Sequence, residues 1–301
     1  MKSLRWFPAL LLVVAAPLGA QSSVWKVTHD GHTLYLGGTC HMLRPSDFPL
    51  PAEFDDAYAE AQHLVFETDL ARMQAPETQQ LMLARGMFGS DEGSLKDALS
   101  PEAWAAVEQY CAGGSLPLGI ANRFRPWLFA VTVAIVELQK LGVTLEGVDV
   151  HYFQRAQADQ KTVAGLEVFE KHLEFVFNLG AGQENEMILH SVKEAAEIPT
   201  MFAGVVAAWR AGDLAKLDEF LAAEMRRDYP NVFHELIVKR NEAWLPQLNA
   251  MLQTGPVEFV LVGAGHLSGA EGLVAALKAR GCTVEQIVAR KTSAVGTAAQ
   301  P

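Results

Sequence analysis

Two short apolar runs, one near each end of the chain, both end in the pattern Gly-x-x-His. The first run, LYLGGTCH, ends at His41, and the second, VLVGAGH, ends at His266. A glycine at a strand end lets the backbone turn sharply and lets a ligand come close, and the histidine three residues later projects from the mouth of that turn. The repeat therefore predicts two strands, far apart in the sequence, that present an imidazole in the same way.

A third strand-like run, HLVFE at residues 63–67, ends in Glu67. Ligands of open α/β sheets bind beyond the carboxyl ends of the strands. If the three strands are neighbours, His41, Glu67 and His266 meet at one edge of the sheet. Two histidines and one glutamate with open positions are the ligand set of catalytic zinc, and they suit iron or manganese equally. A single Gly-x-x-His also arises by chance in a chain with 24 glycines and 9 histidines, and Glu67 could instead cap a helix or pair with an arginine.

The remaining patterns predict an α/β fold with a central mixed sheet, flanking helices and a helical insertion at about residues 168–253. Alternating residues around Asp30-Gly31 predict a hairpin, and residues 76–139 show mostly helical spacing. No linker divides the chain, so we expect one domain over residues 21–290. Further predicted elements are strands at 161–167, 258–262 and 283–288, a strand or turn at 145–150, and helices at 53–62 and 270–280.

The first 20 residues have the pattern of a secretory signal peptide. Lys2 and Arg5 precede an apolar run at residues 7–18, and small residues follow up to Ala20. A run of about 12 apolar residues is too short to span a bilayer, which takes ~20. We therefore expect cleavage after Ala20, a periplasmic or secreted mature protein with no membrane span, and a disordered tail at residues 291–301.

Composition excludes several classes of protein. The formal net charge of −11 argues against a nucleic-acid partner, which would require a basic face. Three cysteines are too few for a disulfide scaffold, and the HExxH, CxxC and phosphate-loop motifs are absent. The unit after residue 257 has the glycine spacing G-x-G-x-x-x-G, which departs from the G-x-G-x-x-G of dinucleotide-binding folds. We therefore reject a dinucleotide-binding function.

Motifs in a fixed order along the chain carry a family resemblance. On them the protein resembles the TraB/PrgY/GumN family, whose animal relatives are the Tiki metalloproteases. The motifs are WKVTHDGHTLYLGGTCH followed by Arg-Pro and Pro-Leu-Pro, FETD, RPW, Gly147-x-Asp149, Gly165-Leu166-Glu167, Trp209 with Gly212-Asp213, Arg240-Asn241 with Trp244, and VGAGHLSGAEGL.

The resemblance implies a metal-dependent hydrolase. In that family the paired Gly-x-x-His motifs, a glutamate and an arginine form the proposed active site, which here corresponds to His41, His266, Glu67 and Arg240. The metal would be manganese, cobalt or zinc, and the substrate a peptide or an envelope protein. Some relatives are discussed as regulators that sequester a peptide, so a non-catalytic peptide-binding protein is the alternative.

Several roles stay open at this level. Arg240 is either a surface ion pair or a clamp for an oxyanion or a carboxylate. The general base is Glu146, Asp149 or a further carboxylate, unless Glu67 is the base and another group binds the metal. Glu146 and Asp149 could also hold an imidazole in place. Cys40 is a buried bystander or an extra soft ligand. The histidines without a partner at ligand spacing are left out: His63, His151, His172, His190 and His234.

Overall fold

The computed structural model of the chain describes residues 21–288, so the predicted signal peptide and the predicted tail lie outside the described residues. Its strands are β1 (Gln21–His29), β2 (His32–Thr39), β3 (His63–Phe66), β4 (Thr162–Gly165), β5 (Glu258–Gly263) and β6 (Thr283–Val288). Its α-helices are α1 (Ala52–Glu60), α2 (Leu70–Gln74), α3 (Pro76–Gly86), α4 (Leu95–Ala98), α5 (Pro101–Ala112), α6 (Leu118–Ala121), α7 (Pro126–Lys140), α8 (Val148–Ala158), α9 (Phe169–Phe177), α10 (Glu184–Glu194), α11 (Ile198–Ala211), α12 (Leu214–Asp218), α13 (Glu224–Asp228), α14 (Pro230–Phe233), α15 (Lys239–Met251) and α16 (Leu273–Ala279). Short 3₁₀ segments are η1 (Pro45–Asp47) and η4 (Ala264–His266), and η2 (Glu219–Ala223) and η3 (His234–Val238) are π-helical.

The six strands form one mixed sheet in the order β4-β3-β5-β2-β1-β6. Strands β4, β3, β5 and β2 are parallel to one another, whereas β1 is antiparallel to both of its neighbours, β2 and β6. This arrangement confirms the predicted α/β fold with a central mixed sheet. Because four adjacent strands are parallel, their carboxyl ends all lie at one edge of the sheet.

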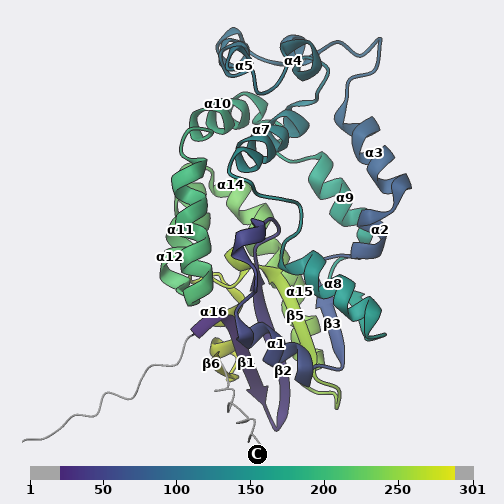
Figure 1. The fold of residues 1–301 in the computed structure, drawn as a ribbon, viewed down its shortest axis with the longest axis vertical. Helices are drawn as coiled ribbons and strands as arrows, with labels where there is room; N and C mark the ends of the chain where they lie inside the picture. The colour runs from purple at the N-terminus through teal and green to yellow at the C-terminus, as the bar shows by residue number, and fades with distance from the viewer. Residues whose placement is uncertain (1–20, 289–301) are drawn as a thin grey trace, which may run out of the picture.

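Strand β5 lies at the centre of the parallel part, and its sequence explains why. Phe259, Val260, Leu261 and Val262 are all fully buried. Phe259 and Leu261 belong to a core shared with α1, α8 and α11, while Val260 and Val262 belong to a second core shared with α15 and α16. A parallel strand covered by helices on both faces is expected to be a continuous apolar run. The sheet is therefore the middle layer between two sets of helices (Figure 1).

The β1–β2 hairpin forms where it was predicted. Asp30 and Gly31 both have positive φ, at 47° and 83°. A two-residue turn needs this conformation when its twist matches the right-handed twist of the two strands. Thr28 pairs with Thr33 on either side of this turn, and β2 then continues parallel to β5. The hairpin thus fixes the register of the strand that ends at the first Gly-x-x-His motif.

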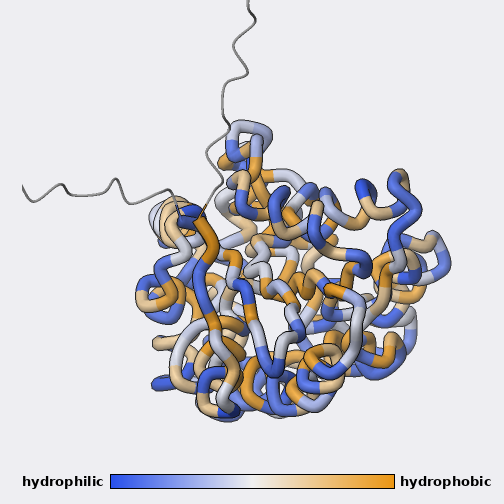
Figure 2. The backbone as a smooth tube through the Cα atoms, turned by 90° about the horizontal axis from the view of Figure 1, so that it is seen from below, coloured by the Kyte–Doolittle hydropathy of each residue, from blue (hydrophilic) through white to orange (hydrophobic). Residues whose placement is uncertain are grey.

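A third core contains no residue of the sheet. It joins α5 and α7 to α10, which includes the fully buried Ile188, so helices from both predicted helical stretches pack together. In Figure 1 these helices lie beyond the end of the sheet opposite the β1–β2 turn. Along many of the helices the chain alternates between hydrophobic and hydrophilic residues, as elements that bury one face do (Figure 2). None of the helices in residues 21–288 is long and apolar enough to cross a membrane.

One local prediction is wrong. Residues 148–150, predicted as strand or turn, begin helix α8, because a contact with a distant segment determines the helix start, as described below. The helix predicted at residues 270–280 forms, but α16 begins only at Leu273. Gly272, directly before it, has an extended backbone with a φ of −73° and a ψ of 154°, so the helix starts after that residue.

Candidate metal centre

The strand order brings the predicted residues to one place. Glu67 follows β3, His266 follows β5 and His41 follows β2, and these three strands are adjacent. A fourth residue, Glu167, follows the neighbouring strand β4 in the same way. The carboxyl edge of the sheet therefore presents two imidazoles and two carboxylates.

Gly263, at the end of β5, marks the point where three of these side chains meet. A Cβ atom at this position would lie 3.2 Å from Oε1 of Glu67, 3.4 Å from Nε2 of His41 and 3.7 Å from Cδ2 of His266. The backbone N–H of Gly263 donates a hydrogen bond to Oε1 of Glu67 at 2.7 Å. The absence of a side chain at residue 263 thus leaves the space around which His41, Glu67 and His266 gather.

Asp149 orients the imidazole of His41. Its carboxylate lies 2.8 Å from Nδ1 of His41, so Nδ1 donates and Nε2 faces the site. Asp149 raises the pKa of His41. The side chain of His41 is 62% exposed, whereas that of His266 is only 6% exposed, so His41 forms the open side of the site. An imidazole that donates its far N–H to a carboxylate is the usual arrangement of a metal-binding histidine.

Gly147 allows α8 to bring Asp149 this close. The helix begins directly against the first Gly-x-x-His turn, where the N–H of Val148 donates to the carbonyl of Cys40 at 3.0 Å. A Cβ atom at Gly147 would lie 2.2 Å from the carbonyl carbon of His41 and 2.3 Å from the carbonyl oxygen of Cys40. These contacts are with backbone, which cannot swing away. Glycine at residue 147 is therefore required for the Asp149–His41 pair.

We expect Gly147→Ala to destabilise the protein by about 3 kcal/mol, the upper part of the range for overpacked sites. The matched control is Gly119→Ala in α6, where a Cβ atom meets nothing within 4 Å, and this change should be neutral or stabilising by up to ~1 kcal/mol. Urea unfolding of both variants measures the difference. Equal unfolding free energies for the two would show that the close approach at Gly147 is unimportant.

His266 is held by an amide. Its Nδ1 lies 2.8 Å from Oδ1 of Asn241, and the Nδ2 of Asn241 in turn donates to the carbonyls of His266 and Glu271. The indole of Trp244 packs against the ring at a centroid distance of 4.5 Å. Burial lowers the pKa of His266 to about 4, so the imidazole is neutral at pH 7 and Nε2 carries a lone pair that faces the site.

Arg240 lies inside the site. Its guanidinium donates to Oε2 of Glu67 at 2.5 Å and to Oε1 of Glu167 at 2.7 Å, and its Nη1 is 3.1 Å from Nε2 of His266. The side chain is 12% exposed, which excludes the reading of Arg240 as a surface ion pair. Glu167 is also bonded to His172 at 2.7 Å. Arg240 therefore neutralises two buried carboxylates next to the metal ligands proposed from the sequence.

The environment of Glu67 keeps it ionised. Burial raises the pKa of Glu67, but the nearby His266, Arg240 and His41 side chains and the N–H of Gly263 lower it by more, so the net pKa lies well below the ordinary value. An efficient general base has a pKa near the working pH. The environment of Glu67 therefore favours a ligand role over that of the base.

Two other candidates have different surroundings. Glu146 borders a separate hollow together with Pro45, Phe48 and His151, so it is not the group that orients His41. Burial, followed by the charges of Asp149 and Asp47, raises the pKa of the Cys40 thiol, which disfavours the thiolate that a metal would need. All three cysteines are unpaired.

Nε2 of His266 lies 3.9 Å from Oε1 of Glu67, a separation that two ligands of one ion can have when each bond is about 2.0–2.2 Å long. Within residues 21–288, the one group of three ligand side chains whose atoms all lie within 4.8 Å of one another is elsewhere, at His190, Glu194 and Glu224. The ligand atoms of His41, Glu67 and His266 around Gly263 are thus more widely spaced, and the Arg240 guanidinium lies beside Glu67 and His266.

A cleft of about 910 Å³ adjoins Arg240. Its apolar lining includes Leu166, Phe175, Leu236 and Trp244, and its charged lining has both signs, with Lys239 paired to Glu235 at 2.7 Å. Glu167 and Arg240 form part of the same wall. The cleft thus leads from the helical part of the molecule to the edge of the sheet that carries the ligand candidates.

Three residues of the site were not predicted as functional. Glu167 follows a strand-like run in the same way as Glu67, so the rule that found Glu67 would also have found it. Asn241 directly follows Arg240, but only the fold shows that it holds His266. Gly147 stands in a quoted motif, and its close contact with residues 40 and 41 is visible only in three dimensions.

One comparison with known proteins identifies the family of the chain. A family model described as the TraB/PrgY/gumN family matches residues 23–286. No curated protein and no solved structure matches the chain. The match spans β1 to β6 and contains every residue of the site described above, so the chain belongs to the TraB/PrgY/gumN family.

Proposed function

We propose that this protein is an exported, metal-dependent hydrolase that cleaves peptides or envelope proteins, with a divalent metal held by His41, Glu67 and His266. The observation that carries the proposal is the convergence of these three side chains around Gly263. Each imidazole is held through Nδ1, by Asp149 or by Asn241, and directs Nε2 to the common space. A pure peptide-binding protein has no need of this arrangement.

The donor set fits a divalent transition metal. Two imidazole nitrogens and one carboxylate oxygen suit manganese, cobalt or zinc, and the site lacks the Cβ that would fill its centre. Metal binding requires a neutral His41, so it displaces a proton from that residue. It also requires the Arg240 guanidinium to withdraw from Nε2 of His266, which it now approaches at 3.1 Å.

When bound, such a metal supplies a Lewis acid that polarises a peptide carbonyl and makes water a better nucleophile near neutral pH. Arg240 then steadies the oxyanion or a substrate carboxylate, a role for which its permanently charged, planar fork is suited. Glu167 and Glu67 hold that guanidinium from two sides. The exposed face of His41 gives substrate access to the site.

The cleft beside Arg240 supports a peptide as substrate. Its apolar walls suit the hydrophobic side chains of a peptide, and its polar lining carries charges of both signs, among them Lys171 and Glu174. The volume of about 910 Å³ is large enough for several residues of an extended peptide.

A screen of the purified protein against peptide libraries tests this function, with zinc, manganese and cobalt added separately. We expect cleavage that depends on one of these ions, disappears after chelation and returns when the metal is added back. Protein that holds metal and binds peptides without cleaving them would favour the peptide-sequestering alternative. Cleavage that is indifferent to chelators would contradict the metal-dependent mechanism.

Export is supported by Lys2, Arg5 and the short apolar run that follows them. We expect amino-terminal sequencing of protein from the native compartment to begin near Gln21. Soluble cytoplasmic protein that retains Met1 would contradict export without bearing on the catalytic site.

A further inference from the structure

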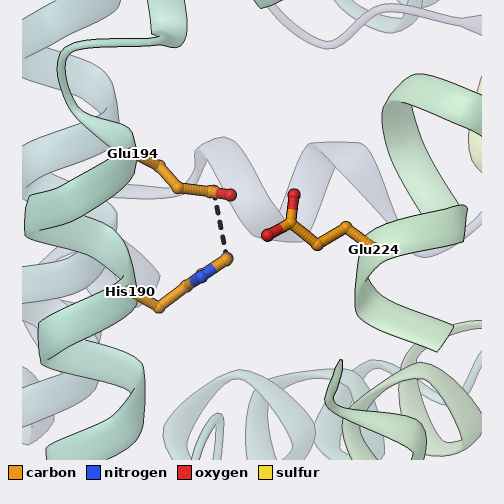
Figure 3. A group of neighbouring side chains, drawn as sticks. All are labelled: His190, Glu194 and Glu224. Carbon is orange, nitrogen blue, oxygen red and sulfur yellow. Dashed lines mark ion pairs between the residues drawn. The ribbon is translucent and has the colours of Figure 1, made fainter. Parts of the chain in front are cut away.

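We infer that a divalent transition metal binds a second site, formed by His190, Glu194 and Glu224. One ligand atom from each residue lies within 4.8 Å of the other two. Figure 3 shows His190 and Glu194 on one helix and Glu224 on another, with all three side chains directed into the space between the two helices. The prediction that His190 has no partner at ligand spacing is therefore wrong.

Helical periodicity places two of the ligands together. His190 and Glu194 are four residues apart in α10, so they lie on one face of the helix, and Nε2 of His190 is 3.0 Å from Oε2 of Glu194. Glu224 is the first residue of α13, directly after the π-helical segment η2. The ring of Tyr229 packs edge-on against His190 at a centroid distance of 4.9 Å, which restricts the orientation of the imidazole.

The local charge favours a cation. Glu194 and Glu224 bring two negative charges to one space, and Glu186 and Asp228 add to the negative potential felt by Tyr229. The cationic side chain that acts on His190 is Lys193. A bound divalent ion would offset the repulsion between Glu194 and Glu224, which the hydrogen bond from a protonated His190 offsets only in part.

The donor set also limits which ion binds. One imidazole nitrogen and two carboxylates suit zinc or manganese, whereas magnesium and calcium prefer oxygen ligands alone. Side-chain exposures of 27% for His190 and 26% for Glu194, together with the partly exposed Glu224, leave room for water to complete the coordination.

The location assigns this ion a structural role. Helix α10 packs into the helical core with α5 and α7, whereas α13 leads into α14 and η3, which contribute Asn231, Val232 and Leu236 to the cleft wall. An ion bound by residues of α10 and α13 links the helical core to that wall. Metal at this site therefore stabilises the position of that cleft wall.

Zinc binding by the full mature chain tests the inference, with equilibrium dialysis and elemental analysis as the readout. We expect Glu194→Gln and Glu224→Gln each to bind one equivalent of zinc fewer than the wild type. The control is Glu186→Gln, which removes the same charge from an exposed position of α10 that offers no ligand atom to the site, so it should bind the same number of zinc equivalents as the wild type. Because the readout is a difference, it does not depend on whether His41, Glu67 and His266 bind metal.

Hydrogen exchange provides the second readout. Zinc should slow amide exchange in residues 224–238 of the wild type and of Glu186→Gln, but not in Glu194→Gln. The free energy of unfolding, measured in the presence of a chelator, checks that all the variants are folded. Glu224 is partly exposed, so its substitution by glutamine should be tolerated. Equal zinc content in all four proteins would overturn the inference.

Discussion

A methyl group at residue 263 is expected to abolish metal binding by His41, Glu67 and His266 while the protein stays folded. Gly263 has a φ of −49° and a ψ of 136°, which alanine adopts without strain. Its Cβ would lie 3.2 Å from Oε1 of Glu67 and 3.4 Å from Nε2 of His41, and both atoms are at side-chain ends that can shift slightly. We therefore expect a stability loss of about 1 kcal/mol.

The same methyl group takes up space that the ion needs. Metal–ligand bonds to nitrogen and oxygen are about 2.0–2.2 Å long, so an ion bound to both Nε2 of His41 and Oε1 of Glu67 has to lie close to the position of a Cβ that is itself 3.2–3.4 Å from these atoms. Gly263→Ala should consequently lose the metal and fall to background turnover, although no ligand atom has been removed.

Gly265→Ala is the matched control for Gly263→Ala. It lies in the same turn, and its Cβ would meet only Leu221 and Ile237, at ordinary contact distances of 3.7 and 3.9 Å. This variant should retain metal and activity. Equal metal content and turnover in the two alanine variants would contradict the placement of the ion.

Removal of the ligands themselves should have the largest effect on turnover. We expect His41→Ala, His266→Ala and Glu67→Gln each to lower kcat on the order of 10³-fold or more, and each to lose the bound metal. His29→Ala, on the partly exposed β1–β2 hairpin, is the histidine control and should behave as the wild type.

The glutamine variant also decides the role of Glu67. Metal retained with turnover lost in Glu67→Gln would reassign Glu67 as the general base, against the low pKa described above. Full activity in either histidine variant would end the proposal of a catalytic metal at these residues.

The strands and their ends could be predicted because their signals are local. The run EFVLVG is apolar throughout, as a buried parallel strand must be, and the glycine and histidine that follow it are fixed by the same few residues. The adjacency of β2, β3 and β5 was stated only as a condition, since strand order depends on contacts between segments far apart in the chain.

The partners of the predicted residues could not be found in this way. Arg240 bonds to Glu67 and to Glu167, which are 173 and 73 residues away, and no local pattern marks these pairs. The start of α8 illustrates the same limit. Its first residues resemble a strand, but the contact of Gly147 with the backbone of His41 brings Asp149 to the imidazole as the first turn of a helix.

Anomalous X-ray diffraction from crystals grown with manganese or zinc tests the central claim most directly. The account predicts an anomalous peak about 2.0–2.2 Å from Nε2 of His41, Nε2 of His266 and the carboxylate of Glu67, with Arg240 withdrawn from His266. Crystals that contain metal only at His190, Glu194 and Glu224, or none at all, while Arg240 still contacts both Glu67 and His266, would contradict it.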